Sequence, residues 1–202
     1  MRVRQTSWQI HEIEGRARMM VSEFWDANEQ EQQRSVRHTQ ACWSPPLAGT
    51  CKANFDAALF EELDCAGLGV VYRDHSGQVI AALSQKIGLP RTVEMAEALA
   101  ARRAVEFARE LCLFDVILEG DCLQVVRALN VHGGCNTLYG HIVNETKRLG
   151  AGLRYCSYQH VGREGNKLAH CLARRAVSAA DIDVWVEDLP GDLDVVFQSD
   201  LF

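Results

Sequence analysis

Lys52-Ala53-Asn54-Phe55-Asp56-Ala57-Ala58 is the stretch that decides the fold, because it reads as a strand with an acid near its end. Two more strands are predicted after it, over residues 67–73 and 78–87, joined by the segment Asp74-His75-Ser76-Gly77. Asp, Ser and Gly are typical turn residues, so these two runs are expected to form a hairpin. The regular part of the chain therefore opens with three consecutive strands.

Helices and strands alternate after the hairpin. An alanine-rich helix is predicted over residues 92–111, with Thr92 as its N-cap. The later elements are a short buried strand at 116–118, helices at 121–130 and 137–149, a strand at 153–158 and a helix at 163–180. Strands one, four and five can lie parallel with right-handed crossovers. The predicted fold class is α/β, a five-stranded mixed sheet in the order 3-2-1-4-5 flanked by helices.

The ends of the chain differ from this regular part. Residues 1–44 are rich in Arg, Glu and Gln, and we interpret them as a helical or flexible tail that leads into a linker. The prolines of Trp43-Ser44-Pro45-Pro46 favour extended backbone and mark that linker. Residues 45–202 are expected to form one domain, with an acidic tail from residue 181 onward.

Composition restricts the functional classes. The net charge of −6 argues against tight sequence-independent binding of nucleic acid, but it does not exclude a nuclease that uses metal ions. The eight cysteines form no C-x-x-C pair, so a structural zinc site is not expected. We find no signal peptide and no run long enough to span a membrane, which predicts a cytoplasmic or nuclear protein without membrane contact. A monomer is expected.

Three acids occupy positions from which a strand or a helix could aim them at one point. Asp56 ends the first strand-like run, Glu97 lies in the first turns of the alanine-rich helix, and Asp121 follows a strand at once. Acids placed in this way can share magnesium, and two such ions can cut a phosphodiester bond. Each acid also has a simpler interpretation: a turn acid, a solvated acid at a helix start, and an N-cap.

Five motifs in this order resemble the type 1 ribonuclease H family, and most closely its plant reverse-transcriptase-like, retroelement-derived version. The resemblance covers roughly residues 43–200 and rests on several short motifs. They are Trp43-Ser44-Pro45-Pro46 with the strand at 52–58, the hairpin at 66–77, Ala96-Glu97-Ala98-Leu99-Ala100, Glu119-Gly120-Asp121, and residues 160–169.

The resemblance implies magnesium-dependent cleavage of the RNA strand in RNA–DNA hybrids by a two-metal mechanism, with Mn²⁺ as a possible substitute. It implies that Asp56 bridges the two ions, while Glu97 and Asp121 each hold one side. His170 stands where many relatives have a fourth Asp, so it is expected to be a catalytic residue and a metal ligand. Because magnesium prefers oxygen ligands, this change is expected to weaken the second ion site.

The resemblance also implies roles for residues around the acids. His160 could shuttle a proton or help to release product, or it could simply cap the sheet. Asn54, Ala57, Ala58 and Asn166 are expected to contact the nucleic acid, and RNA would be selected through its 2′-hydroxyl groups. Ala57 stands where the family usually has Gly, and its methyl group could crowd that contact.

Two rival interpretations remain at this stage. The first is a weak or inactive module of the same fold that binds nucleic acid or a protein partner, which the changes at Ala57 and His170 favour. The second is a genomic remnant without a selected function. The presence of all three core acids favours the enzyme.

Overall fold

The computed structural model describes residues 43–178 and 181–201. The predicted tail and linker over residues 1–44 therefore lie almost entirely outside the described residues, and that prediction stays untested. Among the described residues, no helix has the length and apolar character needed to cross a membrane.

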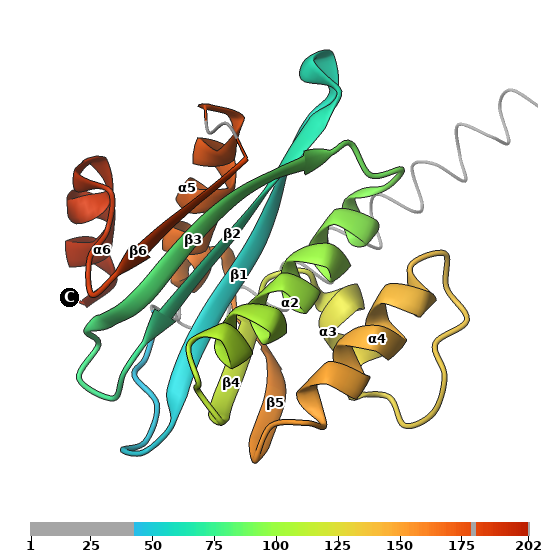
Figure 1. The fold of residues 1–202 in the computed structure, drawn as a ribbon, viewed down its shortest axis with the longest axis horizontal. Coiled ribbons are helices and arrows are strands. Elements are labelled where there is room, and N and C mark those ends of the chain that lie inside the picture. Colours follow the sequence, from blue (N-terminus) through green and yellow to red (C-terminus); the bar gives the residue numbers. More distant parts are fainter. Residues whose placement is uncertain (1–42, 179–180, 202) are drawn as a thin grey trace, which may run out of the picture. The chain divides into compact units, whose positions relative to one another are not determined.

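A single mixed sheet organises the domain (Figure 1). Its strand order is β5-β4-β1-β2-β3-β6. β1 lies parallel to β4 and β4 parallel to β5, whereas β1–β2, β2–β3 and β3–β6 are antiparallel pairs. The strands are β1 (Cys51–Phe60), β2 (Cys65–Arg73), β3 (Val79–Gly88), β4 (Asp115–Gly120), β5 (Tyr155–His160) and β6 (Ile182–Val186). The predicted five-strand order is confirmed, and the structure adds a sixth strand at the edge of β3.

Two hydrophobic clusters cover the two faces of the sheet. Alternate residues of one strand point to opposite faces, so Val70 belongs to the first cluster and Val71 to the second. The first cluster holds α2 (Val93–Glu110), α3 (Leu123–Asn130) and α4 (Gly140–Gly150) against the sheet. The second holds α5 (Lys167–Arg175) and the segment around α6 (Asp194–Leu201), on the other side of the sheet from α2 (Figure 1).

Local chemistry explains how α2 starts and packs. The Thr92 hydroxyl accepts a hydrogen bond from the backbone N–H of Met95 at 3.2 Å, as an N-cap does. Ala96, Ala100 and Ala104 are fully buried, which lets the helix backbone lie close to β1 and β2. This close contact fixes the position of Glu97 relative to the sheet.

A glycine brings α5 equally close to the opposite face. Gly69 of β2 lies opposite Asp56 of β1, and a Cβ atom at Gly69 would sit 2.2 Å from the backbone oxygen of Ala169. Any other residue here would push α5 outward. The residue after Ala169 is His170, so this contact brings His170 to the level of Asp56.

The described residues from 163 onward differ in part from the prediction. The helix expected over residues 163–180 is divided into a 3₁₀ turn, η2 (Arg163–Asn166), then α5, then a second turn, η3 (Ala176–Ser178). The predicted acidic tail begins at residue 181, and the structure describes it up to residue 201. This segment forms β6, η4 (Gly191–Leu193) and α6, because Leu189 and Leu193 are buried in the second cluster and Trp185 packs against it.

Candidate metal centre

A cleft of about 550 Å³ opens where β1, α2, β4 and η2 meet. Its walls come from segments far apart in the sequence. The lining residues are Asp56, Ala57, Val93, Glu97, Asp121, Cys122, Arg163, Glu164, Asn166, Lys167 and His170.

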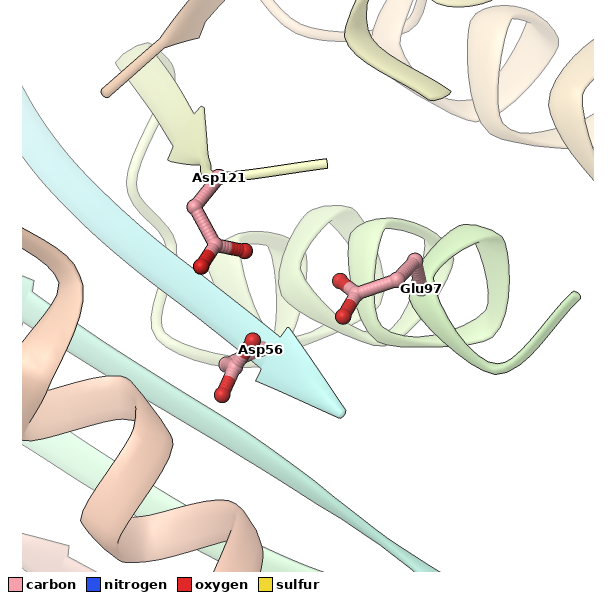
Figure 2. Close-up of side chains that lie close together, drawn as sticks. All are labelled: Asp56, Glu97 and Asp121. Carbon is pink, nitrogen blue, oxygen red and sulfur yellow. The ribbon is translucent and has the colours of Figure 1, made fainter. Parts of the chain in front are cut away.

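Three carboxylates converge in this cleft (Figure 2). Asp56 projects from β1, Glu97 from the second turn of α2, and Asp121 from the residue directly after β4. One ligand atom from each of the three lies within 4.8 Å of the others. The structure thus brings together the three acids that the sequence singles out, although their roles stay a prediction.

The simpler interpretations of these acids do not fit their surroundings. Asp56 lies inside a strand that continues to Phe60, and it is only 3% exposed, so it is no turn acid. Glu97 is 4% exposed and is not a solvated acid at a helix start. The N-cap of α3 is Cys122 rather than Asp121.

Burial and mutual repulsion disfavour ionisation of two of these groups. The pKa of Glu97 rises from 4.5 to about 9, first because the group is buried and then because Asp56 and Asp121 are close. The pKa of Asp56 rises from 3.8 to about 6 through burial and the charge of Asp121, while a hydrogen bond from His170 opposes this rise. At neutral pH, Glu97 therefore retains its proton in the protein alone.

The three acids fit a divalent cation. Oε2 of Glu97 is buried and has no hydrogen-bond partner, although its neighbours are other carboxylates. A buried, unsatisfied carboxylate oxygen is costly, and a hard cation such as Mg²⁺ takes this type of ligand. The donor set therefore fits a hard divalent cation.

His170 lies beside this cluster rather than within it. Its Nδ1 atom and Oδ2 of Asp56 are 2.7 Å apart, and its side chain is 54% exposed. The three-acid group does not include His170. The contact makes His170 a hydrogen-bonding partner of Asp56, while its predicted role as a fourth metal ligand stays untested.

The family match covers this site. A family model described as reverse transcriptase-like matches residues 54–176, which is more than half of the chain and contains all three acids. The chain belongs to the reverse transcriptase-like family. No curated protein matches it.

Solved structures show that this family member has a ribonuclease H fold. RNase H1 from the archaeon Halobacterium salinarum NRC-1 is 28% identical, with a TM-score of 0.59 over 64% of this chain and 98% of that one. The N-terminal RNase H domain of Rv2228c from Mycobacterium tuberculosis, solved as a fusion with maltose binding protein, is 24% identical; it has a TM-score of 0.57 over 65% and 95%. LC11-RNase H1, solved with an RNA/DNA hybrid, is 23% identical with a TM-score of 0.56 over 63% and 96%.

The predicted nucleic-acid contacts of this reverse transcriptase-like domain are mostly buried. Asn54 is fully buried and its amide is taken up by protein partners, so the expected contact between its side chain and nucleic acid does not fit this structure. Ala57 and Ala58 are each 9% exposed. Asn166 donates a hydrogen bond to the backbone oxygen of Phe55 at 3.0 Å, while its Oδ1 is buried without a partner. The amide of Asn166 therefore joins the cleft wall to β1.

His160 ends β5 and is exposed. Its Nε2 atom lies 3.1 Å from the backbone oxygen of Asp121, and it is not among the residues that line the cleft. In the structure His160 therefore supports the turn that carries Asp121. Its predicted roles in proton transfer or product release stay predictions.

Cys122 and Arg163 are among the cleft residues that were not singled out from the sequence. Cys122 lines the cleft directly after Asp121, and Arg163 lines it from η2. The Arg163 side chain is 94% exposed, with its Nε atom 4.0 Å from Oδ2 of Asp121. The position of Arg163 in the motif at 160–169 was the available signal, because that motif already supplied Asn166.

Proposed function

We propose that this protein is a magnesium-dependent endonuclease that hydrolyses the RNA strand of RNA–DNA hybrids. The convergence of Asp56, Glu97 and Asp121 in one cleft carries the proposal. Membership of the reverse transcriptase-like family supports it, and so does the likeness to structures named as ribonucleases H, one of them solved with an RNA/DNA hybrid.

The three acids would hold two Mg²⁺ ions, with Asp56 as the shared ligand and Glu97 and Asp121 on either side. Bound magnesium supplies activation of a water molecule and stabilisation of the leaving oxygen. The protein itself contributes alignment. His170 holds one oxygen of Asp56 through its Nδ1 atom, and packing of α2 on the sheet fixes Glu97. Glu97 must lose its proton for this arrangement to form, so binding releases a proton at neutral pH.

The rim of the cleft would meet the substrate. The exposed Arg163 guanidinium can approach a phosphate, and phosphate contacts position a nucleic acid without reading its sequence. Contacts to 2′-hydroxyl groups near Ala57 and Ala58 would select the RNA strand. With an overall charge of −6, the protein would bind its hybrid mainly through such local contacts. We also propose that it acts as a monomer in the cytoplasm or nucleus.

A second candidate is a module of this fold with weak or no catalysis that binds nucleic acid or a protein partner. The position of His170 favours it, because the imidazole supplies no negative charge and already occupies one oxygen of Asp56. The presence of His170 would then account for a protein that keeps this fold but does not cleave its substrate.

A substrate panel separates the two candidates. The full chain is incubated with Mg²⁺ and end-labelled RNA–DNA hybrid, duplex RNA, duplex DNA or single-stranded RNA. We expect cleavage of the RNA strand of the hybrid alone, with 5′-phosphate ends and complete inhibition by a chelator. Binding of the hybrid without cleavage would favour the second candidate. Equal cleavage of all four substrates would contradict the proposed selectivity.

A further inference from the structure

Both ends of the described domain reach into one buried polar network. Trp43 and Ser44 precede the segment matched by the family, and Asp200 of α6 follows it. Nevertheless, all three contact the basic side chains of Lys52 and Arg73. These contacts join the sheet to segments on either side of residues 54–176.

Arg73 is the centre of the network. It is fully buried, and its Nη1 atom donates to Oδ2 of Asp200 at 3.0 Å. Its Nη2 atom donates to Oδ1 of Asn54 at 2.8 Å. The guanidinium carbon lies 3.7 Å from the ring centre of Trp43, a cation–π contact. Arg73 thus links α6 directly to β1.

Asn54 carries the link onward to the cleft. Its Nδ2 atom donates to the backbone oxygen of Gly165 at 3.1 Å and approaches Oε2 of Glu119 at 3.4 Å. Gly165 lies in η2, the 3₁₀ turn that also contains Arg163 and Asn166 of the cleft wall. The chain of hydrogen bonds from Asp200 through Arg73 and Asn54 therefore ends on the wall of the proposed active site.

Stability alone does not account for this arrangement. Burial lowers the pKa of Arg73, although Asp200 and Glu119 oppose the shift, so the guanidinium is desolvated at a cost. Buried ion pairs are seldom more stabilising than apolar residues of similar size, but they can define one arrangement among several. Here the ion pair would define the position of η2 relative to β1, because Asn54 of β1 donates a hydrogen bond to Gly165 of η2.

We propose that Asp200 is a positioning residue for the cleft: through Arg73 and Asn54 it holds Gly165, and with it the wall formed by η2. Residues 182–201 would then contribute to the geometry of the cleft. The effect on cleavage rests on the proposed function, whereas the effect on the hydrogen-bonded amides does not.

The test compares Asp200→Asn with Asp194→Asn in the full chain. Both changes remove one negative charge from α6, but Asp194 is exposed. The side-chain amide signals of Asn54 and Asn166 are followed by NMR without metal, and hybrid cleavage is measured below the unfolding temperature of each variant. Asp200→Asn is expected to shift both amide signals and to lower kcat about tenfold with little change in KM. Asp194→Asn is expected to change neither.

A third variant, Asp200→Glu, keeps the carboxylate and should lie between wild type and Asp200→Asn in both readouts. It also serves as the test if Asp200→Asn does not fold. A lower melting temperature with unchanged amide signals and kcat would overturn the proposal, because Asp200 would then only attach α6. If the wild-type chain itself does not cleave hybrids, the proposed function fails and the amide signals alone decide this inference.

Discussion

Two buried charged clusters lie next to each other along β1, and they differ in their numbers of positive and negative side chains. Lys52, Asn54 and Asp56 alternate along the strand and share its α5 face. The first cluster pairs Lys52 with Glu119 at 2.9 Å and Arg73 with Asp200 at 3.0 Å, two bases with two acids. The second contains three acids, Asp56, Glu97 and Asp121. Among the described residues, His170 lies 2.7 Å from Asp56, and the exposed Arg163 lies 4.0 Å from Asp121.

This difference separates a cluster whose charges are paired within the protein from the cluster that we propose to bind metal. In the first cluster, which we call the balanced cluster, each acid forms an ion pair with a base of the protein. The acidic cluster compensates instead by raising the pKa of Glu97 to about 9 and that of Asp56 to about 6. A cation could replace the proton on Glu97, whereas each acid of the first cluster is already paired with a base. Removing a charge should therefore have opposite effects on stability in the two clusters.

The largest expected effect is on catalysis. Asp56→Asn keeps the size of the side chain and removes the charge of the proposed shared ligand. Loss of an outer partner of a metal ligand typically costs about 10–100-fold in activity, so loss of a ligand itself should cost more than about 100-fold. Hybrid cleavage and the far-ultraviolet circular dichroism spectrum are measured together. A folded Asp56→Asn protein that cuts at the wild-type rate would refute the assignment.

The second largest effect is expected on stability, when a charge of the balanced cluster is removed. Arg73→Met leaves Asp200 buried without its partner, and loss of one member of a buried ion pair costs roughly 3–5 kcal/mol. Urea unfolding of the full chain should show a loss of this size. A matched change on the surface is Arg91→Met, because Arg91 is exposed; it should leave the unfolding free energy nearly unchanged. Equal stability of the two variants would mean that the cluster is not held by Arg73.

A charge removed from the acidic cluster should stabilise the protein. The folded-state pKa of Glu97 lies above its ordinary value, so the folded state binds more protons and loses stability as pH rises from 4.5 through about 9. Glu97→Gln cannot ionise and escapes this loss. In the absence of metal, the variant should exceed wild type by roughly 1–3 kcal/mol at neutral pH.

The pH dependence provides the control for Glu97→Gln. Its advantage over wild type should be smallest below pH 4.5, where Glu97 is protonated in both the folded and the unfolded state, and should increase toward pH 9. Melting temperatures recorded across this range with a chelator present give the comparison. An advantage that does not change with pH would point to packing rather than to ionisation.

The smallest expected effect is at the exposed edge of the acidic cluster. His170→Asp supplies a fourth carboxylate beside Asp56 and should lower the Mg²⁺ concentration needed for half-maximal cleavage, or raise the rate. His170→Asn, which adds no charge, is the matched control. An unchanged magnesium dependence in His170→Asp would place His170 outside the metal shell.

The sequence predicts the balanced and acidic clusters unequally well. The acids of the cleft are local to recognisable elements, so Asp56, Glu97 and Asp121 could be found from a strand, a helix and a strand end. The balanced cluster depends on long-range contacts such as that between Arg73 and Asp200, which are separated by 127 positions. No local sequence pattern predicts such contacts. The family resemblance assigned Asn54 to contact with nucleic acid, and only the fold shows that its amide forms hydrogen bonds with Arg73 and Gly165.

The C-terminal segment shows a second limit. Ile182, Val184 and Val186 alternate with Asp183 and Trp185, which is a strand pattern, but the sequence analysis noted only that the segment is acidic and predicted no strand there. Pairing with β3 and burial of Leu189 and Leu193 decide the outcome. These are tertiary contacts that override local composition.

We propose that Asp56, Glu97 and Asp121 form a cation site that is incomplete in the protein alone. The most direct measurement is an NMR titration of the Asp and Glu side-chain carboxyl carbons against pH, with and without Mg²⁺. We expect Glu97 to titrate near pH 9 without metal and Mg²⁺ to lower this pKa, with simultaneous changes in the carboxyl-carbon chemical shifts of Asp56 and Asp121. A Glu97 that titrates near pH 4.5 in both conditions, with no Mg²⁺-dependent shift at any of the three acids, would contradict it.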